Sequence, residues 1–266
     1  MSSKYHDWLA FAKKIAIQAG SMILEARQTA SFERDYKLHH ELVTSTDVAV
    51  DAYLCAQIQT RYPQHTILSE ETFPDVSFDS LAEEQVVWVI DPIDGTVNFA
   101  HGHKHVAVSI GLFIGSQRIL GVVHAPFLQE TYYAVKNGGA FCNEQPIQVS
   151  HALQLRNALV ATGFPYQKDA LPELIERLSR VLAVCQDVRR NGSAALDLCW
   201  VAAGRLDAYY ESVKPWDMAA GALIAEEAGA RVGHFLPMLD HWPEVISGEA
   251  LLVATPELYE SLLATL

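Results

Sequence analysis

The chain has 266 residues, of which 50% are hydrophobic and 19% are charged. A chain of this length and composition can bury a large apolar core, which excludes global disorder. Lysine and arginine number 19 against 32 aspartates and glutamates, so the formal net charge is −13. Such acidity excludes broad nucleic-acid binding, which needs a cationic face, and we expect neither nucleic acid nor a membrane as a direct partner. An acidic chain can still act on phosphates where bound cations reverse the local charge.

The first half of the chain predicts helices followed by a meander of strands. Apolar residues recur at three- and four-residue intervals from Trp8 to Ala26, which predicts an amphipathic helix. Residues 31–42 are polar and irregular, and a second helix is expected from about Asp47 to Arg61. Apolar runs and strict alternation then predict strands at 66–69, 86–90, 104–114, 119–123 and 131–135, with a hairpin turn at 137–139.

The second half alternates between helix and strand signals. A strand is expected near 158–163, and another at 205–211 follows helices at 171–185 and 193–203. A helix at 216–228, strands near 231 and 251, and a helix after Pro256 complete the chain. The fold class is therefore mixed α/β (α+β) in layers. We expect an N-terminal α+β lobe (1–150) and a C-terminal α/β lobe (151–266) that together form one compact unit.

Cysteine spacing and the N-terminal segment bear on the compartment. The four cysteines include no C-x-x-C pair, which is typical neither of a zinc knuckle nor of a disulfide framework. The N-terminal segment lacks the apolar run of a signal peptide, and no stretch approaches the apolar length that spans a bilayer. We therefore expect a soluble, cytoplasmic protein.

The strongest local signal is the segment Val86–Thr96, VVWVIDPIDGT, in which an apolar strand leads into two carboxylates. Pro92 fixes its own φ and predicts a tight exit from the strand, so that Asp91 and Asp94 converge. These carboxylates and the carbonyl of Ile93 are hard oxygen ligands, which suit Mg²⁺ or Mn²⁺ rather than zinc. Gly95 and Thr96 would present backbone N–H groups to a phosphate at a helix start. The segment indicates hydrolytic phosphoryl transfer.

A plainer interpretation is that both aspartates only cap a turn and a helix, where Asp is favoured. Two further acidic clusters argue against it, because Glu70 follows another expected strand and Asp217 starts an expected helix. Buried carboxylates are costly without a positive partner, and Lys214 is the only basic residue beside any of these clusters. Divalent metal ions are the expected partners.

Over essentially its whole length, the sequence resembles the inositol monophosphatase family of metal-dependent phosphatases. The resemblance is carried by four motifs in the expected order: LVT-TD (42–47), DPIDGT with Asn98-Phe99, RNGSAA (190–195) and WDMAAG (216–221). It implies a layered αβαβα sandwich of the sugar-phosphatase type. It also implies a homodimer that is inhibited by lithium and hydrolyses a small polyol phosphate, with inositol 1-phosphate as the expected substrate.

The resemblance implies the metal ligands and the catalytic groups. Glu70, Asp91 and the carbonyl of Ile93 would hold one Mg²⁺ ion, and Asp91, Asp94 and Asp217 would hold a second. Glu70 would share a third, looser ion with waters, and Mn²⁺ could replace Mg²⁺. The attacking water would be activated by metal and oriented for in-line attack by Glu70 and Thr96, with Thr96 hydrogen-bonded to Asp47.

The resemblance also implies the residues that contact the substrate. Asp94, Asp217 and the backbone of Gly95 and Thr96 would surround the phosphate. The alcohol part would be faced by Gly192, Ser193, Ala194 and Glu211. Two departures from the family pattern are a serine, Ser69, where glycine usually precedes Glu70, and a connection from Glu211 to Trp216 that is one residue shorter.

The histidine-rich segment His101-Gly102-His103-Lys104-His105 invites a metal-site interpretation, with His103 and His105 on one strand face. No third ligand of matching character accompanies them, and histidine-rich tracts alone are weak evidence. We expect a solvent-facing loop and the start of a strand.

Other functions stay open. A phosphatase with an aspartyl nucleophile would form a covalent phosphoaspartate on Asp91, but its Asp-x-Asp motif has one intervening residue where this chain has two. A non-catalytic regulatory binding protein is an alternative from another class. Within the family, the alternatives are fructose-1,6-bisphosphatase, histidinol-phosphatase and nucleotide 3′-phosphatase activity. One sequence does not resolve these, because selectivity depends on a few contacts.

Overall fold

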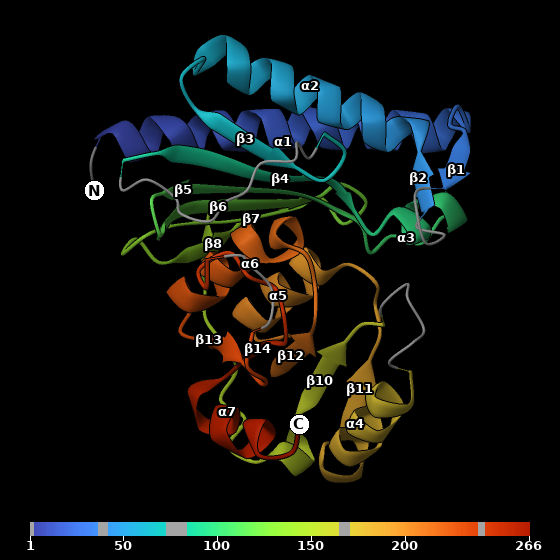
Figure 1. Ribbon diagram of the computed structural model, residues 1–266, viewed down its shortest axis with the longest axis vertical. Helices are drawn as coiled ribbons and strands as arrows, with labels where there is room; N and C mark the ends of the chain where they lie inside the picture. The colour runs from blue at the N-terminus through green and yellow to red at the C-terminus, as the bar shows by residue number, and fades with distance from the viewer. Residues whose placement is uncertain (1–2, 37–41, 73–83, 165–170, 239–242) are drawn as a thin grey trace.

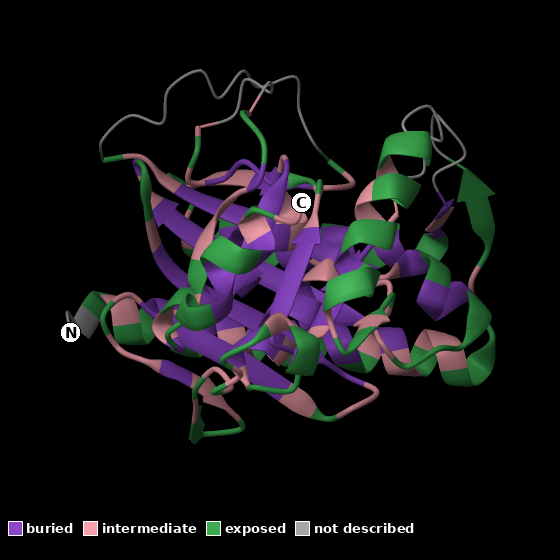
Figure 2. Cartoon of the chain, turned by 90° about the horizontal axis from the view of Figure 1, so that it is seen from below, coloured by how far each residue is buried: buried purple, intermediate pink, exposed green. Residues whose placement is uncertain are grey.

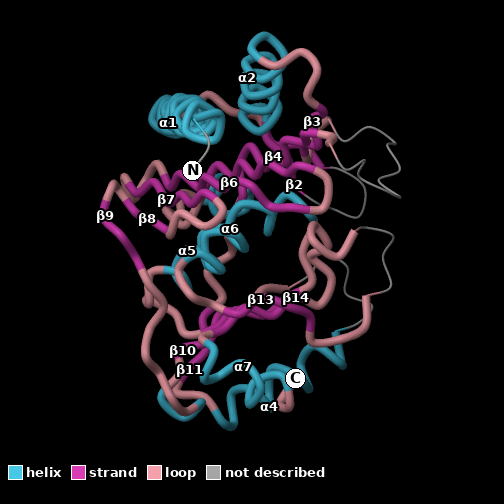
Figure 3. The backbone as a smooth tube through the Cα atoms, turned by 90° about the vertical axis from the view of Figure 1, so that its left-hand side faces the viewer, coloured by secondary structure: helices cyan, strands magenta, loops and turns pink. Residues whose placement is uncertain are grey.

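The computed structural model describes residues 3–36, 42–72, 84–164, 171–238 and 243–266. Its secondary-structure elements stack in five layers: helices, a seven-stranded sheet, helices, a five-stranded sheet and helices (Figures 1 and 3). The layered mixed α/β fold expected from the sequence is confirmed. Buried residues fill the strands and the inner faces of the helices, and exposed residues lie on the outer helix faces and the loops (Figure 2).

The first layer consists of α1 (Ser3–Thr29) and α2 (Ser45–Arg61). Both helices pack on the first sheet, through buried apolar residues that include Trp8 and Ile15 of α1 and Leu54 of α2. Between these helices lies a feature that the sequence did not predict. Strand β1 (Arg34–Tyr36), inside the segment 31–42 that was expected to be irregular, pairs antiparallel with β2 (Leu42–Thr44), which begins at the last residue of that segment.

The seven-stranded sheet has the order β3-β4-β5-β6-β7-β8-β9, and only β3 and β4 pair in parallel. The remaining neighbours form the expected antiparallel meander. The strands span β3 (Thr66–Ser69), β4 (Val86–Asp94), β5 (Ala107–Ile114), β6 (Gln117–Ala125), β7 (Glu130–Val135), β8 (Ala140–Cys142) and β9 (Gln145–Ile147), and the short helix α3 (Thr96–His101) follows β4.

Strand β4 departs from the sequence expectation at its end. Pro92 was expected to end the strand, but β4 continues to Asp94 and stays paired with β5. The register between these strands shifts between Asp91 and Asp94. Such an irregularity inserts extra residues into one strand and bends it, so neighbouring side chains are re-aimed. The two carboxylates therefore converge as expected, but through an irregularity within the strand.

The middle layer consists of α5 (Ala194–Ala202) and α6 (Pro215–Glu227), which lie between the two sheets (Figures 1 and 3). Helix α6 is apolar on nearly every face and packs directly on β4–β7. The approach is close because glycines of the sheet leave room. A Cβ atom on Gly121 would lie 2.5 Å from the carbonyl oxygen of Ala220.

The second sheet has the order β11-β10-β12-β14-β13, with β10 parallel to both of its neighbours and the remaining pairs antiparallel. Helices α4 and α7 cover its outer face (Figure 3). The elements are the 3-10 helix η2 (Leu155–Asn157), β10 (Leu159–Thr162), α4 (Leu171–Val184), β11 (Asp187–Arg189), β12 (Ala208–Glu211), β13 (Arg231–His234), β14 (Leu251–Ala254) and α7 (Pro256–Leu263). Among the described residues, no helix is long and apolar enough to cross a membrane.

Candidate active site

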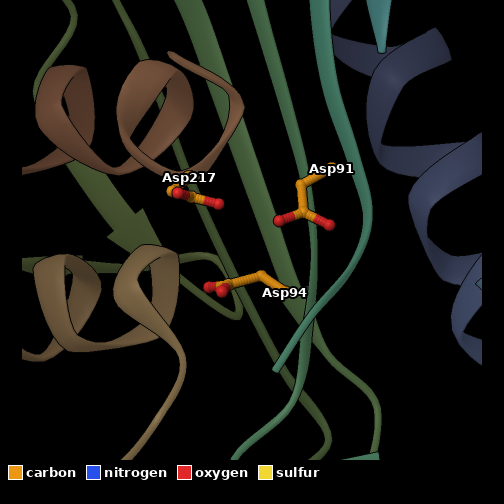
Figure 4. A group of neighbouring side chains, drawn as sticks. All are labelled: Asp91, Asp94 and Asp217. Atoms are coloured by element: carbon orange, nitrogen blue, oxygen red, sulfur yellow. The ribbon is translucent and has the colours of Figure 1, made fainter. Parts of the chain in front are cut away.

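Three carboxylates from two distant segments converge between the first sheet and the middle helices. Asp91 and Asp94 come from the end of β4, and Asp217 comes from the first turn of α6. Each offers an oxygen atom, and these oxygens all lie within 4.8 Å of one another. Figure 4 shows the three carboxylates turned toward one shared space. The structure thus brings together three of the expected metal ligands.

The pKa values of these groups show how poorly the cluster tolerates its negative charge. Burial raises the pKa of Asp91 well above its usual range, and the charges of Glu70, Asp94 and Asp217 raise it further. Burial also raises the pKa of Asp94 to about 6 and, together with the charge of Asp94, that of Asp217 to about 8. Like charges crowded in a low-dielectric site disfavour ionisation. A divalent cation would remove this cost, so the donor set fits Mg²⁺ or Mn²⁺.

Asp94 is fixed in place by the N-terminus of α5. The Ser193 hydroxyl and the Ala195 N–H each donate to Asp94 Oδ2 at 2.6 Å, and the Ala194 N–H donates to Oδ1 at 3.3 Å. A carboxylate at a helix N-terminus is stabilised by unpaired N–H groups and by the helix dipole. These bonds partly offset the effect of burial on the pKa of Asp94. They also make α5 a structural partner of β4.

A second hydrogen-bonded chain runs from α2 to the start of α3. Asp47 Oδ2 accepts the Thr44 N–H at 2.8 Å, while its Oδ1 accepts the Thr96 hydroxyl at 2.9 Å. The Thr96 hydroxyl also lies 3.1 Å from the carbonyl oxygen of Ile93. It has one proton, which favours the shorter contact with the charged carboxylate. The Ile93 carbonyl then keeps its lone pairs for another partner, and the expected pairing of Thr96 with Asp47 is present.

Glu70 reaches the same pocket from the end of β3. Its N–H donates to the Ile90 carbonyl oxygen at 3.2 Å, and its charge raises the pKa of Asp91. The preceding residue, Ser69, is buried, and its hydroxyl donates to the buried carboxylate of Asp51 on α2. Asp51 was not among the functional residues predicted from the sequence. Its position one turn after Asp47, beside the apolar stripe of Val50 and Leu54, was a signal that could have revealed it.

The carboxylates line a pocket of about 550 Å³, a volume typical of sites for small ligands. All the residues expected to face the substrate line it: Asp94, Gly95, Thr96, Gly192, Ser193, Ala194, Glu211 and Asp217. Two cationic side chains, Arg190 and Lys214, also line it. The structure therefore gathers the expected substrate-facing positions around one cavity, next to the carboxylate cluster.

The shortened connection does not remove Glu211 from this pocket. Tyr209 donates to Glu211 Oε2 at 2.5 Å, and burial raises the pKa of Glu211 to about 7. The carboxylate lies where a side chain at position 163 would be, because a Cβ on Gly163 would lie 1.9 Å from Oε2. The connection itself is tied to a neighbouring loop by the Val213 N–H, which donates to the Gly248 carbonyl oxygen at 2.9 Å.

The histidine-rich segment corrects one sequence prediction. Strand β5 begins at Ala107, so His103 and His105 precede it and share no strand face. The His105 side chain was expected to face solvent, but it is largely buried, with its Nε2 3.0 Å from Asp197 Oδ1. Its ring also meets that of Trp200 edge-on. The prediction failed because the partners lie on α5, more than 90 residues away.

Comparisons with known proteins show which sequences and structures the chain is similar to. The sequence profile described as the inositol monophosphatase family matches residues 4–266. The Nus factor SuhB of Vibrio cholerae is 38% identical over 239 residues, which cover 89% of this chain and 88% of that protein. The crystal structure of extragenic suppressor protein suhB from Bartonella henselae has a TM-score of 0.87 at 28% identity and covers 97% of this chain and 98% of that one. The structure of inositol monophosphatase from Anabaena (Nostoc) sp. PCC 7120 has a TM-score of 0.83 at 33% identity and covers 99% and 96%, respectively.

Proposed function

The chain belongs to the inositol monophosphatase family, and from this premise we propose that it is a Mg²⁺-dependent phosphomonoesterase that hydrolyses inositol 1-phosphate to inositol and phosphate. The observation that carries the proposal is the cluster of Asp91, Asp94 and Asp217. It lines a pocket whose other wall offers backbone and side-chain groups to a small polyol. The pocket thus has room for both parts of such a substrate.

We assign the metal ligands as the family resemblance implies. Glu70, Asp91 and the Ile93 carbonyl would hold one cation, and Asp91, Asp94 and Asp217 would hold a second. A third cation would be shared between Glu70 and water. Bound Mg²⁺ would neutralise the phosphate charge and lower the pKa of a nearby water molecule.

The chain itself would orient that water and receive its proton. Because the Thr96 hydroxyl donates to Asp47 Oδ1, its lone pairs are left to accept a hydrogen bond from water in the pocket. As the water attacks, Thr96 Oγ1 can take its proton and pass its own to Asp47. Burial raises the pKa of Asp47, which makes this carboxylate a stronger base than an exposed aspartate. Glu70 would hold the water from the other side.

The opposite wall would hold the alcohol. Glu211 lines the pocket and would accept a hydrogen bond from a hydroxyl group of the polyol, with Gly192 and Ala194 beside it. The backbone N–H groups of Gly95 and Thr96, at the start of α3, would hold phosphate oxygens. The phosphate and the alcohol would then be bound by separate parts of the chain.

The decisive experiment measures phosphate release from inositol 1-phosphate, with and without Mg²⁺, by the wild type and Asp91→Asn. We expect Mg²⁺-dependent release that lithium inhibits and that Asp91→Asn abolishes. Asp7→Asn is the matched control, since Asp7 pairs with Arg61 on the surface and lies outside the pocket. Its activity should equal that of the wild type. A fully active Asp91→Asn variant would overturn the assignment of the site.

A panel of monoesters tests the substrate. Fructose 1,6-bisphosphate, histidinol phosphate and a 3′-phosphonucleotide should be hydrolysed with lower kcat/KM than inositol 1-phosphate. A higher value for any of them would replace the proposed substrate with that compound. Trapping of a phosphoaspartate on Asp91 would instead favour a covalent mechanism.

A regulatory role is the second candidate, and the name of a relative favours it. The protein from Vibrio cholerae that is 38% identical to this chain is called a Nus factor. A purely regulatory protein would leave every monoester of the panel intact in the presence of Mg²⁺. Turnover by the wild type and its loss in Asp91→Asn would exclude a purely non-catalytic protein.

The oligomeric state, the compartment and the division of the chain near residue 150 stay predictions. We propose a homodimer in the cytoplasm, with no membrane or direct nucleic-acid partner. Light scattering of the purified chain would test the dimer, because a mass of 29.4 kDa would identify a monomer.

A further inference from the structure

The loop that carries the substrate-facing Gly192 is held by the side chain of one asparagine on α3. Asn98, on α3, is buried, and its side-chain amide donates to the backbone carbonyl oxygens of His105 and Asn191, each at 2.8 Å. Both protons of the amide nitrogen are therefore used. One contact fixes the segment before β5, and the other fixes the loop between β11 and α5.

A buried aspartate binds the same two residues through their side chains. Asp197 Oδ1 accepts the Asn191 amide at 2.7 Å and lies 3.0 Å from His105 Nε2. These contacts form a closed ring of hydrogen bonds. In it, Asn98 binds the backbone carbonyls of residues 105 and 191, and Asp197 binds their side chains. Trp200 packs edge-on against the His105 ring, with centroids 4.7 Å apart, and limits its rotation.

The ring of hydrogen bonds lies next to two glycines that line the pocket. A Cβ on Gly95 would lie 3.0 Å from the carbonyl oxygen of His105 and 3.1 Å from that of Gly192. A Cβ on Gly192 would lie 3.0 Å from the Asn98 amide nitrogen. Both glycines have positive φ, which favours glycine over any other residue. The backbone of Gly192 therefore lies close to the Asn98 amide, so a movement of this asparagine would shift the alcohol-facing wall of the pocket.

We propose that Asn98, His105 and Asp197 are positioning residues that fix the loop 190–193 and thereby determine how strongly the enzyme selects a monoester by its alcohol part. The inference rests on the proposed function and extends it to residues outside the expected metal-binding and phosphate-binding groups, of which Asp197 also lines the pocket. The physical link that we propose is the chain of hydrogen bonds that runs from α3 to α5. The alternative is a brace that only stabilises the fold, and such a brace would affect every substrate equally.

The experiment compares kcat/KM for inositol 1-phosphate and for 4-nitrophenyl phosphate, which has no polyol. In Asn98→Ala we expect the value for inositol 1-phosphate to fall about tenfold, as for the loss of one or two hydrogen bonds. The value for 4-nitrophenyl phosphate should change less than about twofold, because its aryl group makes no hydrogen bonds to the loop. Most of the loss should appear in KM.

Conservative variants separate hydrogen bonding from packing. Asp197→Asn keeps an oxygen that accepts both bonds, and His105→Gln keeps a donor at a similar reach, so both should retain most of the selectivity. Asp197→Ala and His105→Ala should lose it, as Asn98→Ala does. The matched control is Asn143→Ala, because Asn143 also makes two side-chain hydrogen bonds but lies outside the pocket. Its selectivity should equal that of the wild type.

A second readout does not depend on activity. Hydrogen exchange of the amides of residues 192–195 should be faster in Asn98→Ala than in the wild type, while exchange in the first sheet stays unchanged. Unchanged exchange at 192–195, or equal losses for both monoesters, would overturn the inference. If the wild type hydrolyses no monoester, the proposed function fails, and the exchange pattern alone decides whether the ring positions the loop.

Discussion

The two walls of the pocket are built in different ways. The carboxylate wall comes from the end of a central strand and the first turn of a helix buried between two sheets, so the pairing of β4 with β5 and the packing of α6 on the sheet fix its geometry. The alcohol wall comes from the loop 190–193, the end of β12 and the connection 212–215, which side-chain hydrogen bonds hold. This difference separates the two demands on the enzyme. Under the proposed function, the chemistry would depend on the end of β4 and the start of α6, and the selectivity would depend mainly on the loop and the connection of the alcohol wall.

The largest expected effect is on the carboxylate wall. Asp217→Asn should lower kcat/KM more than about 100-fold for every monoester, because partners outside the metal shell already cost up to that factor. The metal-free variant should also melt at a higher temperature than the wild type above pH 8, since one buried charge is removed. Phosphate release and thermal denaturation measure the two effects. A loss confined to polyol phosphates would contradict the separation of the two walls.

Thr96→Ala should lower turnover about 100-fold, the lower end of the range for proton transfer by a positioned side chain. The affinity for Mg²⁺ should change little, because the Thr96 side chain bonds to Asp47 and the Ile93 carbonyl and offers no carboxylate. Thr96→Ser keeps the hydroxyl group and should restore most of the turnover. Isothermal titration with Mg²⁺ provides the second measurement. Equal losses of turnover and metal affinity would argue against a role in orienting water.

The stability of the metal-free protein should fall as the pH rises from about 4 to about 8. The folded state keeps Asp91, Asp94 and Asp217 protonated to higher pH than the unfolded chain does, so it binds more protons in this window. The stabilisation is complete below the unfolded pKa and is lost as each folded pKa is passed. Asp94 alone should contribute roughly 3 kcal/mol, since its pKa rises from 3.8 to about 6.

Urea denaturation at several pH values, with EDTA and then with Mg²⁺, measures this effect. Excess Mg²⁺ should restore the stability at pH 8, because binding to the folded state shifts the equilibrium by mass action. The surface variant Asp7→Asn should follow the wild-type curve in this window. A metal-free protein whose stability rises between pH 5 and 8 would contradict the charge balance of the carboxylate wall.

The smallest expected effect is on the alcohol wall. Glu211→Gln should raise KM for inositol 1-phosphate several-fold, up to about tenfold, by weakening one hydrogen bond to the polyol. KM for 4-nitrophenyl phosphate should stay within about twofold of the wild type. Steady-state kinetics on the two esters gives this ratio. A similar drop in kcat for both esters would place Glu211 with the carboxylates instead.

The difference between the two walls also explains which parts of the site could be predicted from the sequence. Asp91 and Asp94 follow a long apolar strand, and the repeated acidic residues at strand and helix ends predicted one metal cluster. The prediction that Pro92 ends the strand was wrong, because the pairing of β4 with β5 continues past it. Asp51 and the burial of His105 escaped prediction. Their partners, Ser69 and Asp197, are brought close only by the tertiary fold.

For the fold, long periodic elements were predicted within a few residues, and several three-residue strands were missed. Strands β1, β2, β9 and β11 have three residues each, too few to show a period. Strand β11 is extended because it pairs with β10, and helix α4 separates these two strands in the sequence. Such strands owe their conformation to a partner distant in sequence, so no local pattern reveals them.

Gly121 limits which substitutions the sheet can accept beneath α6. Its missing side chain lets α6 lie against the sheet, and Asp217 stands one helical turn from the point of contact at Ala220. A single added methyl group at this strand would push the helix outward and lengthen the gap between Asp217 and the aspartates of β4. The spacing of the carboxylate cluster therefore depends on the absence of a side chain at a glycine that lies outside the pocket.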